Sequence, residues 1–184
     1  MGRAIFLLGY NYGMKTKLLA FLLAPSFLFL FSGSVFGQKT EVKKEYWGEE
    51  KLKSEKHYKD GKIDGFFTIW HKNGKKHYKT HFKADKKDGP SAAWYPNGEK
   101  RYEKNYKLGR EHGRFTIWYQ NGLKEWEAHY KNGAQDGRFT FWYENGQKKT
   151  KRNYNNGKED GLATIWNKDG VVLSEKYFVD ESKQ

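Results

Sequence analysis

The sequence predicts an all-β protein, an elongated single-layer antiparallel meander of about five and a half 24-residue β-hairpin repeats preceded by a signal peptide. Three observations support this class: a 24-residue period without gaps, two glycine positions in each unit, and β-branched and aromatic runs between the glycines. The period is plainest where "RFTIWYQNGLKEWEAHYKNGAQDG" at 114–137 runs into "RFTFWYENGQKKTKRNYNNGKEDG" at 138–161. One hairpin cannot bury its own aromatic face, so stacked copies are expected to stabilise each other.

The segment before the repeats has the order of a secretory signal peptide. Lys15 and Lys17 follow Met14, and the apolar run 18–31 is succeeded by the small residues of "SGSVFG". The run of 14 residues is shorter than the roughly 20 of a membrane-spanning helix. We expect a signal peptide at 1–37, with Met14 as an alternative start, and a secreted or periplasmic protein. An uncleaved N-terminal anchor is the alternative.

Cysteine is absent from the sequence. This excludes disulfides, thiolate metal sites and the lipid-bearing cysteine of a lipoprotein. Residues 38–45 are expected to be a linker and residues 46–184 a tandem repeat domain. The predicted units are 46–65, 66–89, 90–113, 114–137, 138–161 and 162–184.

Each unit reads as a β-hairpin. "RFTIWY" at 114–119 is a strand, "QNG" a turn, and "LKEWEAHYK" at 123–131 the second strand. In "YPNGE" the order of Pro96, Asn97 and Gly98 predicts a three-residue loop that ends in a glycine bulge. The repeated glycines expected at turns are Gly65, Gly74, Gly89, Gly98, Gly113, Gly122, Gly137, Gly146, Gly161 and Gly170. Asp85 replaces a glycine of the pattern, which predicts a looser turn there.

The motifs "WYxNGxK" and "YxNGKxDG" resemble MORN-type repeats, specifically the bacterial variant of the YwqK-type antitoxin family. The resemblance covers residues 46–178. It implies a sheet that serves as a scaffold or as a protein- or lipid-binding surface. An antitoxin role is implied only by association, because one fold serves many functions.

No catalytic residues, metal site or cofactor are predicted. The best metal candidates are His77 and His81, but four residues of a strand span roughly 13 Å, too far for two ligands of one zinc ion. No nucleophile or phosphate-binding motif is present.

A ladder of tryptophans is the first candidate surface. Phe67 and Ile69 share one predicted face, whereas Thr68 and Trp70 share the other. The ladder is Trp70, Trp94, Trp118, Trp142 and Trp166. We expect it mainly to stabilise the ribbon; the alternative is an exposed track for a glycan, peptide or partner protein.

Positive charge marks the second candidate surface. The net charge is +13, and residues 51–87 hold 12 lysines against four acidic residues. The candidate lysines are Lys62, Lys76, Lys86, Lys100, Lys124 and Lys148. A solvated margin is the plainer interpretation; contact with a protein or with an anionic lipid or polysaccharide, including peripheral membrane contact, is the sharper one. Nucleic acid is not expected for an exported protein.

These observations predict a non-enzymatic binding or scaffolding module that contacts an anionic envelope component or a protein. The alternative function is that of an antitoxin or immunity-type protein that neutralises a partner toxin.

Overall fold

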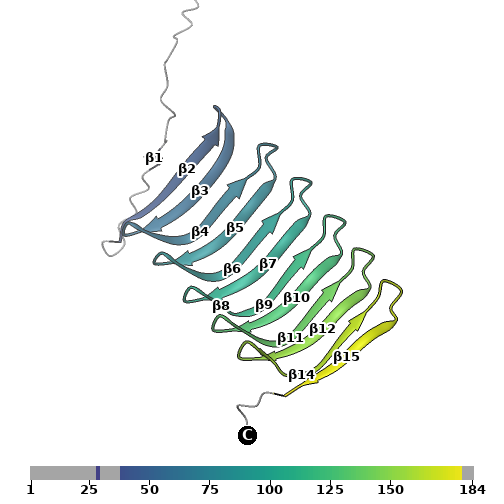
Figure 1. Cartoon of the computed structure of the whole chain (residues 1–184). Coiled ribbons are helices and arrows are strands. Elements are labelled where there is room, and N and C mark those ends of the chain that lie inside the picture. Colours follow the sequence, from purple (N-terminus) through teal and green to yellow (C-terminus); the bar gives the residue numbers. More distant parts are fainter. Residues whose placement is uncertain (1–27, 30–37, 180–184) are drawn as a thin grey trace, which may run out of the picture.

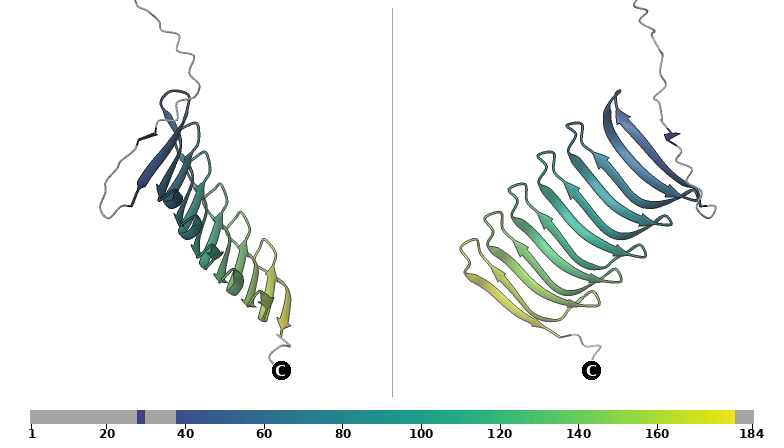
Figure 2. Two further views of the ribbon diagram at one scale, coloured as in Figure 1. Left: turned by 90° about the vertical axis from the view of Figure 1, so that its left-hand side faces the viewer. Right: turned by 180° about the vertical axis from the view of Figure 1, so that it is seen from behind.

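The chain folds as one open antiparallel sheet. The computed structural model describes residues 28–29 and 38–179, which form 15 strands and no helix. Each strand pairs with its neighbours in the sequence, so the sheet is a meander (Figure 1). Seen from the side, the described strands form a single layer (Figure 2). The predicted all-β single-layer meander is confirmed; apart from 28–29, the predicted signal peptide lies outside the described residues.

The strands repeat with the 24-residue period. Their bounds are β1 Leu28–Phe29, β2 Thr40–Trp47, β3 Lys51–Lys59, β4 Lys62–Trp70, β5 Lys76–Lys83, β6 Lys86–Trp94, β7 Lys100–Lys107, β8 Arg110–Glu111, β9 Gly113–Trp118, β10 Lys124–Lys131, β11 Ala134–Trp142, β12 Lys148–Asn155, β13 Lys158–Glu159, β14 Gly161–Trp166 and β15 Val172–Phe178. The pairs β8/β9 and β13/β14 correspond to single strands such as β4, interrupted by one residue.

Strand β2 lies largely inside the segment 38–45 that the sequence suggests is a linker. It forms a hairpin with β3, in which Thr40 lies opposite Lys59 and Trp47 opposite Lys51. Strand β1 pairs with the other side of β2. Strand β2 has Glu41 and Tyr46 where the following repeats have glycine and tryptophan, so the 24-residue periodicity does not reveal it. The first hairpin of the ribbon therefore starts within the predicted linker, and β1 precedes it in the sheet.

The three-residue loops have the geometry that "YPNGE" predicts. The N–H of Gly98 donates to the carbonyl of Tyr95 at 2.8 Å, and the N–H of Tyr95 donates to the carbonyl of Glu99 at 2.9 Å. Gly98 has a φ of 93°, the left-handed place of such a loop. The side chain of Asn97 accepts a further bond from the N–H of Glu99 at 3.0 Å. The prediction of a glycine-ended loop is confirmed.

Two-residue turns connect the hairpins at the opposite margin of the sheet, and both turn residues have positive φ. The turns are Asp60–Gly61, Ala84–Asp85, Leu108–Gly109, Asn132–Gly133 and Asn156–Gly157. Asp85, where a looser turn is predicted, keeps this geometry with a φ of 65°. Its carboxylate accepts a bond of 2.7 Å from the N–H of Ile63, and its own N–H donates to the carbonyl of Ile63 at 2.9 Å. These bonds to the preceding repeat hold the turn without glycine.

A second set of glycines lies in the strands, although the sequence suggests turns. The pairing of β3 with β4 shifts between Lys56 and Tyr58, which marks a β-bulge. Gly65 at this bulge has a φ of 109°, and a Cβ there would stand 3.1 Å from the Cβ of His57. The corresponding glycines are Gly89, Gly113, Gly137 and Gly161. Their left-handed backbone bends each strand just after the turn, which explains why they recur so close to it.

Small side chains form the interior. Thr80, Ser91, Thr116 and Ala128 are at most 1% exposed, and the buried hydrophobic residues of the described chain are all alanines. A single layer has no second sheet to cover large side chains, so aromatic residues lie over smaller neighbours and stay partly exposed. The ribbon therefore has two open faces.

Side chains bond from one repeat to the next. The hydroxyl of Tyr95 donates to the carbonyl of Trp118 at 2.8 Å, and Tyr143 does the same to Trp166 at 2.9 Å. In the first repeat the indole N–H of Trp47 takes this role, with a bond of 3.2 Å to Trp70. Each bond satisfies a carbonyl at the end of a strand.

Candidate binding surfaces

The tryptophan ladder and four of the candidate lysines lie on one face. Each ladder tryptophan is the last residue of its strand, β4, β6, β9, β11 or β14. The ammonium groups of Lys76, Lys100 and Lys124 stand 5.9, 5.3 and 5.6 Å from the ring centroids of the tryptophans one repeat further, Trp94, Trp118 and Trp142. Lys148 holds the same place at the start of β12. The structure thus joins two surfaces that the sequence analysis treats separately.

Carboxylates partly neutralise the four lysines of this face, which we call the lysine column: Lys76, Lys100, Lys124 and Lys148. Lys100 pairs with Glu103 and Lys124 with Glu127, both at 2.7 Å. Burial raises the pKa of Glu127, but the hydrogen bond and charge of Lys124 outweigh it and hold the pKa below its usual value. Thr116 lies across the strands from Glu127 and donates to it at 3.4 Å. Lysine, tryptophan and glutamate together link neighbouring repeats.

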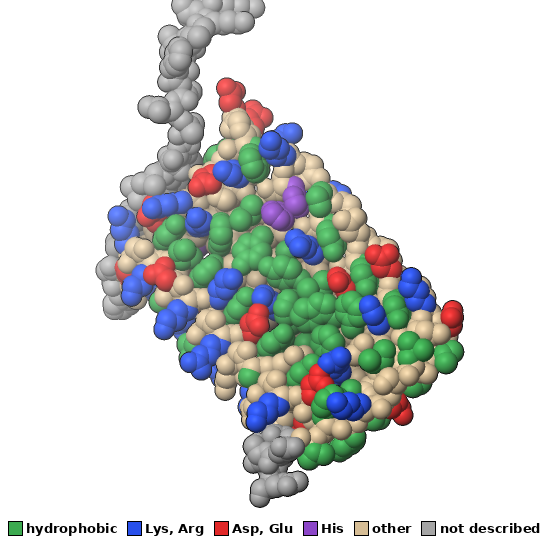
Figure 3. All heavy atoms as spheres, in the orientation of Figure 1, with side chains coloured by type: hydrophobic (Ala, Val, Ile, Leu, Met, Phe, Trp, Pro, Cys, Tyr) green, Lys and Arg blue, Asp and Glu red, His purple; other side chains and the backbone are tan. Residues whose placement is uncertain are grey.

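An aromatic cluster, which the sequence analysis missed, covers the middle of the sheet. Phe67 contacts Tyr78, and a separate series of contacts runs from Tyr102 to Tyr154, with the centroids of contacting rings 4.5 to 6.3 Å apart. The members are Phe67, Tyr78, Tyr102, Phe115, Trp126, Phe139 and Tyr154. In the view of Figure 3, hydrophobic side chains form a band over the central strands. The signal was present in the sequence, because residues 78, 102 and 126 occupy one position of the repeat.

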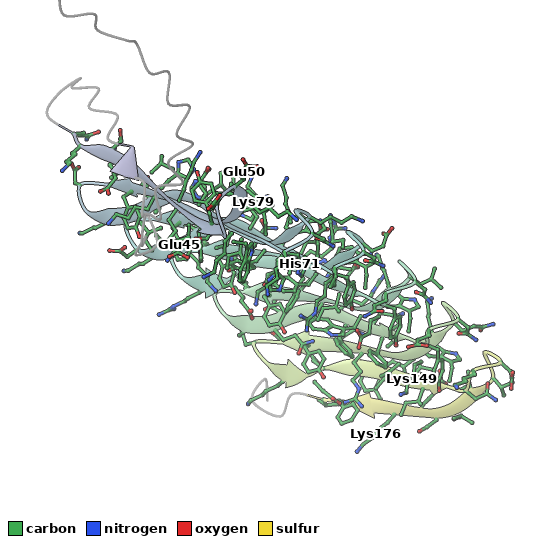
Figure 4. All side chains as sticks on the ribbon, turned by 90° about the horizontal axis from the view of Figure 1, so that it is seen from above. Glu45, Glu50, His71, Lys79, Lys149 and Lys176 are labelled. Carbon is green, nitrogen blue, oxygen red and sulfur yellow. The ribbon has the colours of Figure 1, made fainter. Side chains whose placement is uncertain are left out.

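Basic side chains border this cluster. Lys104 lies 4.6 Å from the ring centroid of Phe115 and pairs with Glu111 at 2.6 Å. Burial alone lowers the pKa of Lys104, but bonds to Glu111 and Tyr106 outweigh it and raise the pKa. Lys149 lies over Phe141 and Tyr143 at 5.1 and 5.3 Å. Figure 4, which labels Lys149, shows side chains standing off both faces of the sheet.

The histidines make separate contacts. His77 stacks on His71 with ring centroids 4.3 Å apart, whereas His81 donates to the carbonyl of Asp88 at 2.6 Å. Burial, followed by the charges of His71 and Arg101, lowers the pKa of His77. Among the described residues, no group of three or more His, Cys, Asp or Glu side chains is placed to hold a metal ion.

Lys62 and Lys86 lie apart from the lysine column, at the margin of two-residue turns. Here basic residues stand directly opposite each other on paired strands: Lys59 with Lys62, Lys83 with Lys86, and Lys107 with Arg110. Lys131 and Lys158 flank the last two turns. We call these eight residues the basic margin. In Figure 3 Lys and Arg gather along the side where Figure 1 shows these turns.

The last strand exposes apolar side chains. Leu173 is 64% and Tyr177 70% exposed, and β15 ends the strand order of the described sheet.

No helix in the described part of the chain is long and apolar enough to cross a membrane.

The hairpins are similar to a known repeat. Residues 87–108 and 135–156 match the family described as MORN repeat variant. The two matches lie in the same phase of the 24-residue period. The first covers β6 and β7, the second covers β11 and β12, and each ends at the two-residue turn that follows. The chain matches no curated protein. The match concerns the repeat and does not extend to an antitoxin family. The two matched hairpins are therefore similar to the MORN repeat variant, a likeness that suggests a repeat-based binding module.

Proposed function

We propose that this chain is a non-enzymatic binding module, exported to the periplasm or cell exterior, that contacts an anionic component of the cell envelope. The observation that carries the proposal is an open single-layer ribbon whose positive charge is concentrated in its first hairpins. Residues 51–87 hold 12 lysines against four acidic residues, whereas residues 88–184 hold 17 basic against 14 acidic residues. A field of one sign attracts anionic partners and weakens as salt rises.

Two measurements test this function. Fractionation of native cells, with mass spectrometry of the N-terminus, should find a periplasmic or released chain that begins near Gln38. The chain should bind an anionic polysaccharide or phosphatidylglycerol vesicles, and should bind a neutral dextran or phosphatidylcholine vesicles much less. Added salt should weaken binding to the anionic ligand. A cytoplasmic chain that retains Met14, or equal binding to neutral and anionic ligands, would contradict the proposal.

The absence of catalysis is part of the proposal. Strand geometry and separate contacts keep His77 and His81 from forming one site. Changing both to alanine should leave the zinc content of the purified chain unchanged. Zinc retained by the wild type and lost in the double variant would point to an enzyme or a metal-binding protein instead.

Strand β15 favours a second candidate, the neutralisation of a partner toxin by protein contact. Its exposed apolar side chains at a sheet edge suit pairing with another protein. Coexpression with the toxin-sized product of a neighbouring gene should then restore growth. A Leu173→Lys/Tyr177→Lys variant should lose this protection while remaining folded. No change in growth with the wild-type chain would exclude that gene product as the target.

A further inference from the structure

The basic margin places like charges opposite each other. In the first three two-residue turns, the residues before and after the turn are cross-strand partners and both are basic. Directly opposed partners in an antiparallel pair have Cα atoms about 4.5–5.5 Å apart, where like charges destabilise the sheet. Lys62, Lys83, Lys86, Lys107 and Arg110 are all exposed. Bound negative charge would relieve this repulsion.

Nearby carboxylates are engaged by backbone rather than by these lysines. Asp60 accepts a bond of 2.9 Å from the N–H of Lys39, and Asp85 one of 2.7 Å from Ile63. Asp64 and Asp88 each accept from a turn N–H of the following repeat, at 3.2 and 3.3 Å. The acids therefore tie adjacent turns together. They leave seven basic groups of the margin without a carboxylate partner within ion-pair distance: of the described residues, Lys59, Lys62, Lys83, Lys86, Lys107, Arg110 and Lys131 form no ion pair.

The lysine column on the tryptophan face is different. Lys76, Lys100 and Lys124 already lie against tryptophan rings, and two of them pair with glutamates. An anionic ligand at that face would have to displace these contacts. The opposed basic pairs at the first three two-residue turns present their charges with no such competition.

The basic pairs form a single row along the margin. Each repeat advances the sheet by two strands, so successive basic pairs stand roughly 10 Å apart in a row one sheet thick. The turns line up along one side of the ribbon (Figures 1 and 2). Such a row matches an extended polymer with regularly spaced anionic groups, which can engage several pairs at once and gain by multivalency.

The turn residues narrow the ligand class further. Across the five turns they are Asp, Ala, Leu, Asn and Gly, with Leu108 the one large apolar side chain. One leucine offers little apolar area for insertion into a bilayer. None of these residues is aromatic, whereas proteins that bind single-stranded nucleic acid stack bases on aromatic rings.

We propose that the basic margin binds a linear anionic polysaccharide laid along the row of two-residue turns, with its strongest contacts at the first three turns. This inference rests on the proposed function and names its site and ligand class.

The test uses the full chain and oligogalacturonates of increasing length as the probe. Two variants lose the same number of charges: Lys62→Gln/Lys83→Gln/Lys86→Gln at the margin, and Lys76→Gln/Lys100→Gln/Lys124→Gln at the tryptophan face. We expect the margin variant to bind the longest oligomer about tenfold more weakly and with a shallower salt dependence. The face variant should lose less than about twofold, since its lysines are held by internal contacts. Affinity should rise with oligomer length as further pairs are engaged.

Controls separate folding from binding. Replacing the same margin lysines with arginine should restore affinity, and thermal melting should show that all variants fold. Equal losses in the margin and face variants, or affinity independent of length, would overturn the margin site while leaving the proposed function intact. Tighter binding to phosphatidylglycerol vesicles or to poly(dT) than to the oligomers would overturn the ligand class. Failure of the wild type to bind any anionic probe would refute the proposed function itself.

Discussion

The hydroxyl of Tyr119 donates a hydrogen bond of 2.7 Å to the carbonyl of Trp142, one repeat further along the chain. The bond joins a loop to the end of the next hairpin's strand, at a point where the backbone ladder stops. Corresponding side chains make the same connection in other repeats. The repeats are thus linked by side chains as well as by strand pairing.

Removal of this hydroxyl should weaken the ribbon. Tyr119→Phe leaves the Trp142 carbonyl without its partner and should lower the free energy of unfolding by about 1 kcal/mol. Chemical denaturation monitored by circular dichroism measures the change. Tyr177→Phe is the matched control, because Tyr177 is 70% exposed and its hydroxyl should make no comparable contribution. Equal effects of both changes would show that the inter-repeat bond contributes nothing.

The bulge glycines should be harder to replace than the turn glycines. Gly65→Ala combines a φ of 109° with a Cβ 3.1 Å from His57 and should cost roughly 1–3 kcal/mol in the free energy of unfolding. Gly61 has a φ of 78° and no atom within 4 Å of a Cβ, and asparagine tolerates this left-handed conformation. Gly61→Asn should therefore change stability by about 0.5 kcal/mol or less. The ranking of the two melting temperatures checks the prediction, and a reversed order would contradict it.

Acid should destabilise the first hairpins slightly through His77. Its pKa in the folded chain lies below the usual 6.5, so the unfolded chain binds the proton more readily. Stability is therefore lost as pH falls through about 6.5 towards the lower folded pKa. The effect should be small, because His77 is exposed.

His77→Gln removes this titration. The melting temperature of the His77→Gln variant should fall less between about pH 7.5 and pH 5.5 than that of the wild type. A His77→Gln profile that matches the wild type would remove the histidine stack from the account of pH dependence.

The exposed apolar residues of β15 should promote association. Leu173→Lys/Tyr177→Lys places charge on an edge strand, which discourages pairing with another chain. We expect less concentration-dependent light scattering and nearly unchanged stability, since the two side chains are 64% and 70% exposed. Lys168→Glu/Lys176→Glu, which also changes two positions but removes no apolar side chain, provides a comparison. Persistent association of the first variant would place the contact elsewhere.

The sequence by itself determined the hairpin, the repeat and the glycine-ended loop, because these depend on local turn chemistry and strand propensity. Tyr95-Pro96-Asn97-Gly98 specifies its loop through φ preferences that need no distant partner. Only the tertiary structure decided which glycines bend strands, since a β-bulge is defined by the register of the opposite strand, as Gly65 is by His57. The tertiary structure also decided which lysines make internal contacts and which lie at the open margin. Lys100 lies against Trp118 and Glu103, whereas Lys86 faces Lys83 at an open margin. The 24-residue spacing alone treats these lysines alike; contacts between neighbouring repeats distinguish them.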